Sequence, residues 1–132
     1  MTVDSVLDAL KKLKEISKVS PDEFFSDWKL HASALWYFYT LIQGLLDLTG
    51  KLIVKKGFRQ PTSYADYIYV LGENGIIPKD KIKNFVKMAK FRNVLAHAYS
   101  SINLVLIFEF LKKNLCDAEE FLRILVKELR EG

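Results

Sequence analysis

The sequence has few of the residues that form covalent or metal crosslinks. It contains one cysteine, Cys116, and two histidines among 132 residues. A single cysteine cannot form an internal disulfide, and this set of side chains lacks the ligands of a Cys/His zinc site. We therefore expect a cytoplasmic protein that uses neither a metal ion nor a cofactor.

Long hydrophobic runs are also missing. The most apolar stretch, residues 32–46, is interrupted by Thr40, Gln43 and Gly44, and it is shorter than the roughly 20 residues that span a bilayer. The N-terminus brings in acidic residues at once, which is not typical of a signal peptide. We expect neither export nor contact with a membrane.

The chain has only a small excess of positive charge. Twenty Lys and Arg residues face sixteen Asp and Glu residues, a formal net charge of +4, which is compatible with a nucleic-acid ligand but does not establish one. Half of the residues are hydrophobic and 13% are aromatic, a composition typical of a packed globular chain. The length predicts a single domain over residues 1–132.

Apolar residues recur every three or four positions in five segments, and none alternates with the period of two that strands show. The first segment carries the stripe Val3, Leu7, Leu10, Leu13 and Ile16. The second runs from about Trp28 to Lys56, and the others begin near Pro61, Ile77 and Ser100 or Ser101. This pattern predicts an all-α, antiparallel helical bundle of about five helices.

Local signals mark the ends of several segments. Ser20 followed by Pro21 is typical of a helix start, while Asp27 is a competing cap that favours a short turn before the main helix. Gly57 is expected to end that helix. The last segment has a heptad-like apolar seam from residue 104 to residue 129, which predicts one long helix packed on an antiparallel neighbour.

The segment from Trp28 to Lys56 is apolar around its whole circumference. A helix of this kind is expected to be buried on all sides. In so small a bundle, one of those sides is best covered by a second copy of the chain. We therefore expect a homodimer with an isologous interface.

The residues best suited to chemistry lie in Arg92-Asn93-x-x-x-His97-x-Tyr99, where an amphipathic helix gives way to two serines. Cleavage of RNA needs a base that removes the 2′-hydroxyl proton and a fixed cation that stabilises the charge on the phosphate. His97 can exchange a proton near neutral pH, and Arg92 can bind two phosphate oxygens at once. This pair would need no metal ion.

Helix geometry limits how these side chains meet. A step of five residues separates Arg92 from His97 by about 140° on a straight helix, so the sequence predicts either a bend near Ala96 or a cleft shared with a second subunit. Asn93 and His97 are four residues apart, which allows the amide to fix the imidazole tautomer.

Structural interpretations stand beside these functional ones. Arg92 would pair with an acidic neighbour, His97 would cap a helix end and Tyr99 would belong to the core. The residues alone favour neither interpretation. Lys83, Lys87 and Lys90 lie on one helical face, where they would either follow an RNA backbone or simply be solvated.

The chain resembles HepT-type proteins of the HEPN superfamily nearly from end to end. The resemblance rests on the Arg-x4-His-x-Tyr pattern, on residues 46–52 and 88–93, and on residues 61–64 followed by residues 75–78. It implies a dimeric HEPN bundle that acts as a metal-independent endoribonuclease toxin. The implied partners are an RNA substrate and a small nucleotidyltransferase antitoxin of the MNT type.

The resemblance also implies roles for individual residues. Arg92 and His97 would be catalytic, Asn93 would support them, and Tyr99 would be the residue to which the antitoxin attaches AMP. The alternative is a non-catalytic helical dimer that binds nucleic acid or a nucleotidyltransferase partner.

Overall fold

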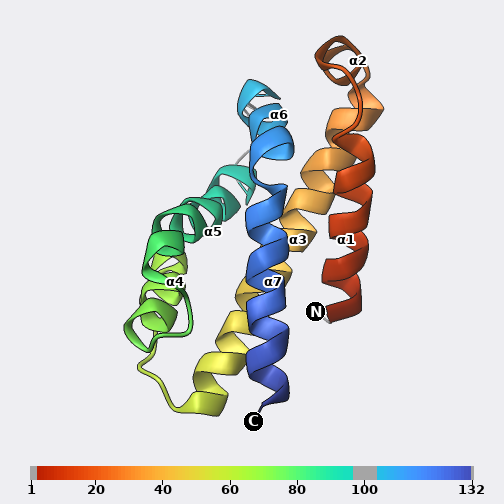
Figure 1. Cartoon of the computed structure of the whole chain (residues 1–132). Helices are drawn as coiled ribbons and strands as arrows, with labels where there is room; N and C mark the ends of the chain where they lie inside the picture. The colour runs from red at the N-terminus through yellow and green to blue at the C-terminus, as the bar shows by residue number, and fades with distance from the viewer. Residues whose placement is uncertain (1–2, 97–103, 132) are drawn as a thin grey trace.

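The fold is a helical bundle, seen in Figure 1. A computed structural model describes residues 3–96 and 104–131. These residues form seven α-helices and one 3-10 helix, with no strand among them, which confirms the all-α prediction. The helices are α1 (Val3–Ile16), α2 (Pro21–Ser26), α3 (Trp28–Lys56), α4 (Tyr64–Glu73), η1 (Lys79–Lys81), α5 (Ile82–Ala96), α6 (Leu104–Lys113) and α7 (Leu115–Arg130).

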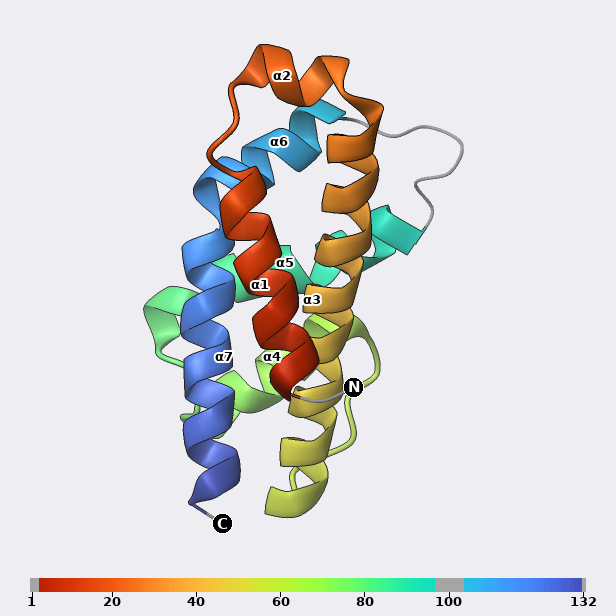
Figure 2. The ribbon, with the colours of Figure 1, turned by 90° about the vertical axis from the view of Figure 1, so that its right-hand side faces the viewer.

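Helix α3 is the central element, and it contacts each of the other six α-helices. Helices α1 and α7 lie together along one side of it, while the pair α4 and α5 lies on the other side (Figures 1 and 2). Helices α2 and α6 meet at one end of the bundle. The α4–α5 pair therefore has α3 behind it and an outer surface of its own.

The predicted helix ends are confirmed where local hydrogen bonds decide them. The Ser20 hydroxyl accepts a hydrogen bond from the Glu23 amide at 3.2 Å and begins α2. The Asp27 carboxylate accepts from the Lys29 amide at 2.9 Å and begins α3, so α2 is a separate short helix. Gly57 ends α3 with a φ of 70°, a left-handed conformation that favours glycine.

A single chain does not cover α3 on all sides, and the predicted burial of the whole helix depends on the second copy of the chain, which stays a prediction. Trp28 is 68% exposed and Trp36 is 65% exposed, although Phe38, Leu41 and other residues of the helix belong to the core. The physical reason is length, because α3 has 29 residues whereas α1 has 14 and α5 has 15. Its neighbours within the chain do not cover the whole helix.

The predicted stripe on the first helix is partly wrong. Val6 and Ala9 are buried, whereas Leu7 is exposed at the edge of a shallow groove between α1 and α7. Leu10, Leu13 and Ile16 are buried as predicted. Apolar residues stand at both 6 and 7, so their spacing alone does not decide which one faces the core.

The prediction of one long final helix is also wrong, since the helix is interrupted at Asn114, between α6 and α7. The Asn114 side chain donates to the Asp117 carboxylate at 3.3 Å, a local bond that competes with helix continuation. This break and the separate α2 raise the number of α-helices in the described residues to seven, against about five predicted. The predicted apolar seam is confirmed at Leu111, Leu115 and Leu122, which are buried.

Candidate active site

Arg92 lies near the end of α5 and turns toward α3 and α4. Its Nε donates a hydrogen bond to Oε1 of Gln43 at 2.9 Å. The guanidinium carbon lies 4.7 Å from the ring centroid of Tyr64 and 5.6 Å from that of Tyr39. These distances are typical of cation–π contacts. Three helices thus fix the position of one cation.

A second hydrogen bond sets the orientation of the Gln43 amide. Its Nε2 donates to Oδ1 of Asp47 at 3.0 Å, because the two residues are one helical turn apart on α3. With its nitrogen bound to the carboxylate, the amide presents its oxygen to Arg92. The negative charge of Asp47 is therefore separated from Arg92 by a neutral group.

Among the described residues, none neutralises Arg92 or occupies its two terminal nitrogens. Within residues 3–96 and 104–131, no carboxylate forms an ion pair with Arg92, and no acceptor binds either terminal nitrogen. The interpretation in which Arg92 pairs with an acidic neighbour is therefore wrong for the described residues. Because the side chain is only half-buried, a phosphate can approach the fork of these two nitrogens.

The other predicted motif residues are only partly described. Asn93 follows Arg92 on α5 and is exposed. His97 and Tyr99 lie outside the described residues, as do Ser100 and Ser101. The contact between Asn93 and His97, the bend near Ala96 and the shared cleft therefore stay predictions.

The reasoning from sequence missed four residues of this site: Tyr39, Gln43, Asp47 and Tyr64. One signal was present for two of them, because Gln43 and Asp47 are polar residues one turn apart in an otherwise apolar helix. Polar groups at such positions need partners. Nothing in the local pattern pointed to the two tyrosines.

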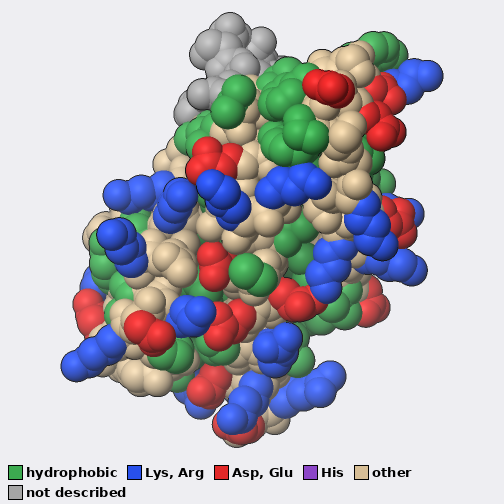
Figure 3. Space-filling view, turned by 45° about the horizontal axis from the view of Figure 1, so that its top comes forward, with side chains coloured by type: hydrophobic (Ala, Val, Ile, Leu, Met, Phe, Trp, Pro, Cys, Tyr) green, Lys and Arg blue, Asp and Glu red, His purple; other side chains and the backbone are tan. Residues whose placement is uncertain are grey.

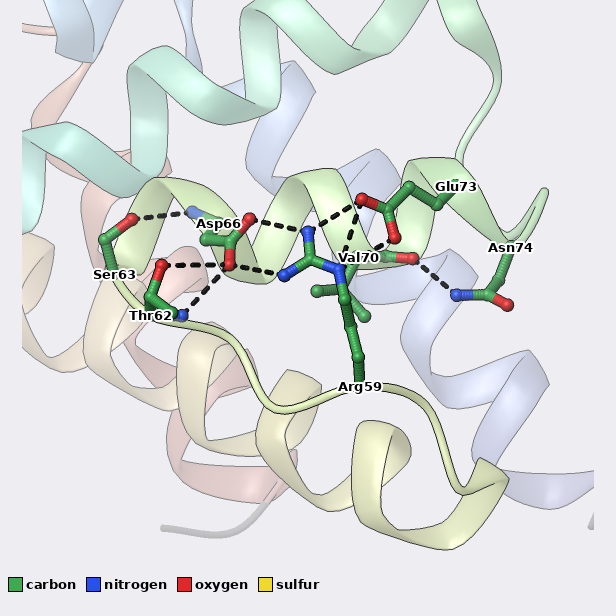
Figure 4. Close-up of polar contacts among 7 residues, drawn as sticks. All are labelled: Arg59, Thr62, Ser63, Asp66, Val70, Glu73 and Asn74. Carbon is green, nitrogen blue, oxygen red and sulfur yellow. Dashed lines mark hydrogen bonds and ion pairs between the residues drawn. The ribbon is translucent and has the colours of Figure 1, made fainter.

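A second arginine, Arg59, lies in the loop between α3 and α4 and is bound by two carboxylates (Figure 4). Its Nη1 and Nη2 each donate to Asp66 at 2.8 Å, and its Nε and Nη2 donate to Glu73 at 2.9 and 2.7 Å. These hydrogen bonds raise the pKa of Arg59 and lower the pKa values of Asp66 and Glu73.

This Arg59 cluster positions the start of α4. Asp66 also accepts a hydrogen bond from the Thr62 amide at 3.0 Å, and the Ser63 hydroxyl accepts one from the Asp66 amide at 3.0 Å (Figure 4). The next residue is Tyr64, whose ring lies against Arg92. The cluster therefore fixes the loop and helix end that hold part of the Arg92 site.

The three lysines predicted on one face of α5 do share a surface. Lys83, Lys87 and Lys90 are exposed and line one groove of about 1320 Å³ between α4 and α5. In Figure 3, Lys and Arg side chains are exposed on the side of the molecule where these two helices lie, and others are spread over the rest of this face. Binding of RNA by these lysines stays a prediction.

Comparison with known proteins gives a family and a fold. A family model described as "Ribonuclease HepT-like" matches residues 6–125. The mRNA nuclease HepT of Shewanella oneidensis is 23% identical over 128 residues, which cover 96% of each chain. The match with the family model confirms the resemblance inferred from the motif and its context.

Solved structures with low sequence identity share the fold. A crystal structure of a toxin–antitoxin with AMP-PNP has a TM-score of 0.84 at 19% identity, over 95% of this chain and 94% of that chain. A tri-AMPylated Shewanella oneidensis HEPN toxin in complex with MNT antitoxin has a TM-score of 0.83 at 20% identity, over 95% and 93%. These likenesses confirm the HEPN-type bundle.

Within the part of the chain that the structure describes, no helix combines the length and the apolar character that crossing a bilayer requires.

Proposed function

The chain belongs to the ribonuclease HepT-like family, and on that premise we propose that it is a metal-independent endoribonuclease toxin of the cytoplasm. The observation that carries the proposal is the state of Arg92. A neutral amide and two aromatic rings hold this cation in place, and no carboxylate of the described residues competes with a phosphate for its charge. The mRNA nuclease HepT, similar over nearly its whole length, supports RNA as the substrate.

The proposed reaction uses Arg92 and His97 as the catalytic pair. The imidazole of His97 takes the proton of a 2′-hydroxyl, and the 2′-oxygen bonds to the adjacent phosphorus. The bond from phosphorus to the 5′-oxygen breaks, and the imidazolium returns the proton to that oxygen. Arg92 stabilises the charge that gathers on the phosphate oxygens. Asn93 accepts from or donates to the imidazole and holds it in one tautomer.

Cleavage of RNA in EDTA tests this proposal. The wild type is expected to cut, while the Arg92→Ala and His97→Ala variants lose cleavage by about 100-fold or more. The Arg123→Ala variant serves as a matched control because Arg123 is an exposed arginine on α7. Equal cleavage by all four proteins would contradict the assignment. Cleavage by none would favour the non-catalytic dimer, and loss of cleavage in EDTA alone would contradict metal independence.

We propose a homodimer that covers the exposed face of α3 near Arg92. Trp36 is 65% exposed, and it precedes Gln43 by seven residues, so both lie on nearly the same face of the helix. A second copy seated on Trp36 would therefore border the Arg92 site.

Light scattering at micromolar concentration tests the dimer. The wild type is expected to have twice the mass of one chain, and Trp36→Lys is expected to dissociate it. Val54→Lys is the matched control, because Val54 is exposed near the other end of the same helix. A monomeric wild type, or equal dissociation by both variants, would contradict this interface.

The proposed partner is a nucleotidyltransferase antitoxin of the MNT type, which attaches AMP to Tyr99. Support comes from the tri-AMPylated HEPN toxin in complex with MNT antitoxin that shares this fold. A bulky anionic adduct two residues beyond His97 would exclude a substrate phosphate. Mass spectrometry after incubation with such an enzyme and ATP should find AMP on Tyr99. AMP on Tyr64 or Tyr39 instead would contradict the assignment.

A further inference from the structure

The groove between α4 and α5 has a charge distribution that the proposed reaction does not use. Five basic and two acidic residues line it, whereas the whole chain has a net charge of +4. The residues that line this groove therefore carry most of the excess positive charge of the chain. Such a concentration favours an anionic ligand.

The two acidic residues of the groove are already bound. Asp66 and Glu73 both accept hydrogen bonds from Arg59. Lys79, Lys83, Lys87 and Lys90 also line the groove, and none of them pairs with a carboxylate among the described residues. The lysine side of the groove is therefore not neutralised from within the described part of the chain.

An aromatic ring lines the groove together with these lysines. Tyr69 of α4 is 46% exposed and lines the same groove. No other aromatic ring packs on Tyr69 among the described residues, whereas Tyr64 and Tyr67 contact each other. An exposed ring beside a row of cations is the combination that binds single-stranded nucleic acid, because the ring stacks on a base and the cations bind phosphates.

We infer that this groove binds single-stranded RNA, with one unpaired base stacked on Tyr69 and the phosphates along Lys83, Lys87 and Lys90. The inference rests on the proposed ribonuclease function and names the form of RNA that the enzyme takes. In a duplex the faces of each base are covered by its neighbours, so only an unpaired base can lie on the tyrosine.

The groove and the Arg92 site belong to the same pair of helices. The lysines span about 10 Å along α5, and Arg92 follows Lys90 by two residues. On α4, Tyr64 contacts Arg92 and Tyr69 lines the groove. A strand held along the groove would thus lie on the same two helices that position the arginine proposed to bind the cleaved phosphate.

Binding can be measured apart from cleavage with an oligonucleotide that carries 2′-O-methyl groups and so lacks the attacking hydroxyl. We choose a length of about 10 nucleotides, within the range of known single-strand sites, and measure fluorescence anisotropy. Tyr69→Leu is expected to weaken binding roughly 5- to 150-fold, the worth of one stacked base. Tyr69→Phe keeps the ring and is expected to bind like the wild type.

Salt dependence tests the lysines. Replacing Lys83, Lys87 and Lys90 by Gln should reduce the slope of log affinity against log salt by about 2, since each phosphate contact on a single strand contributes about 0.7. The matched control replaces three exposed lysines outside the groove by Gln: Lys11, Lys18 and Lys51. This control should change the slope much less.

Three results would overturn the inference. These are equal binding by Tyr69→Leu and Tyr69→Phe, equal salt slopes for the two triple variants, and equal affinity for a duplex of the same length. The proposed function fails on a different measurement, the cleavage of unmodified RNA in EDTA. If the protein cleaves RNA but its affinity for the oligonucleotide does not depend on Tyr69, this inference is wrong and the proposed function still holds.

Discussion

Arg59 and Arg92 both lie against α4, but they are held in opposite ways. Arg59 donates to two carboxylates, Asp66 and Glu73. Arg92 donates to the amide of Gln43 and lies against two tyrosine rings. The charge of Arg59 is therefore neutralised within the chain, whereas that of Arg92 is not neutralised by any described residue.

The difference indicates a structural role for Arg59 and, among the described residues, leaves the charge of Arg92 available to a ligand. A guanidinium that binds two carboxylates crosslinks the segments that carry them, here the loop after α3 and both ends of α4. A guanidinium held by neutral groups keeps its orientation without giving up its charge. Substitutions that exchange or remove these contacts should therefore affect cleavage at Arg92 and stability at Arg59.

The shape of the Arg92 cation should matter as well as its charge. Arg92→Lys keeps one positive charge but removes the planar fork and its contact with Tyr64. We expect RNA cleavage to fall about 100- to 1000-fold, as when one fixed donor to a developing negative charge is lost. The measurement is the single-turnover rate on unmodified RNA. Arg123→Lys, on an exposed residue of α7, should leave that rate unchanged, and a rate for Arg92→Lys near that of the wild type would contradict a role for the fork.

Gln43→Glu should make Arg92 resemble Arg59. The change places a carboxylate where the amide oxygen now lies 2.9 Å from Nε. Hydrogen bonds to charged groups are worth about 1.5–3 kcal/mol, so a substrate phosphate that must displace this carboxylate should react roughly 10- to 150-fold more slowly. Gln43→Met is the control that removes the hydrogen bond without adding charge. If Gln43→Glu cleaves RNA faster than Gln43→Met, the comparison of the two arginines is wrong.

Loss of the Tyr64 ring should lower the RNA cleavage rate less than the changes at Arg92 and Gln43. Cation–π contacts are worth about 0.5–2 kcal/mol, so Tyr64→Leu should lower the cleavage rate roughly 2- to 30-fold. Tyr64→Phe keeps the ring and should behave like the wild type, because the ring face is what Arg92 contacts. Equal losses for the two variants in the same assay would assign the role to the hydroxyl group instead.

Loss of Arg59 should change stability and its pH dependence more than catalysis. The pKa values of Asp66 and Glu73 are lowered in the folded chain, first by their hydrogen bonds to Arg59. Their contribution to stability is therefore present above the ordinary carboxyl pKa of about 4 and is lost as the pH falls through the lower folded values. Arg59→Ala should accordingly lower the Tm at pH 7, and its deficit should shrink as the pH falls below about 4.

Thermal unfolding at several pH values measures this effect. Arg123→Ala is the matched control, because Arg123 is more exposed and pairs with the single carboxylate of Glu119 at 3.9 Å, a pair expected to contribute little. A deficit for Arg59→Ala that stays constant from pH 7 to below pH 3 would contradict the ion-pair explanation.

The sequence predicted those parts of the fold that depend on neighbouring residues. Asp27 and Gly57 set the ends of α3 through bonds within a few residues, so the predicted bounds of that helix are confirmed. The break at Asn114 was missed because Leu111 and Leu115 keep the helical spacing across it. Spacing of apolar residues describes the buried face and does not require the backbone to be continuous.

The candidate site was predictable only in part, because several of its contacts join residues that are far apart in the sequence. Arg92 stood out by its residue type and by its place in the motif, but Gln43 precedes it by 49 residues. A contact over that separation depends on how α3 and α5 pack. The role of Tyr64 likewise depends on the loop that the Arg59 cluster holds.

The most direct test compares the two arginines in one assay. Arg92→Ala and Arg59→Ala are incubated with the same unmodified RNA in EDTA, at a temperature where both are folded, and single-turnover cleavage is measured. We expect Arg92→Ala to lose about 100-fold or more. Arg59→Ala should lose no more than the roughly 2- to 30-fold expected for Tyr64→Leu, because Arg59 acts on the Arg92 site only through the position of Tyr64. Cleavage retained by Arg92→Ala, or lost equally by both variants, would contradict the claim that Arg92 is the available cation of this ribonuclease.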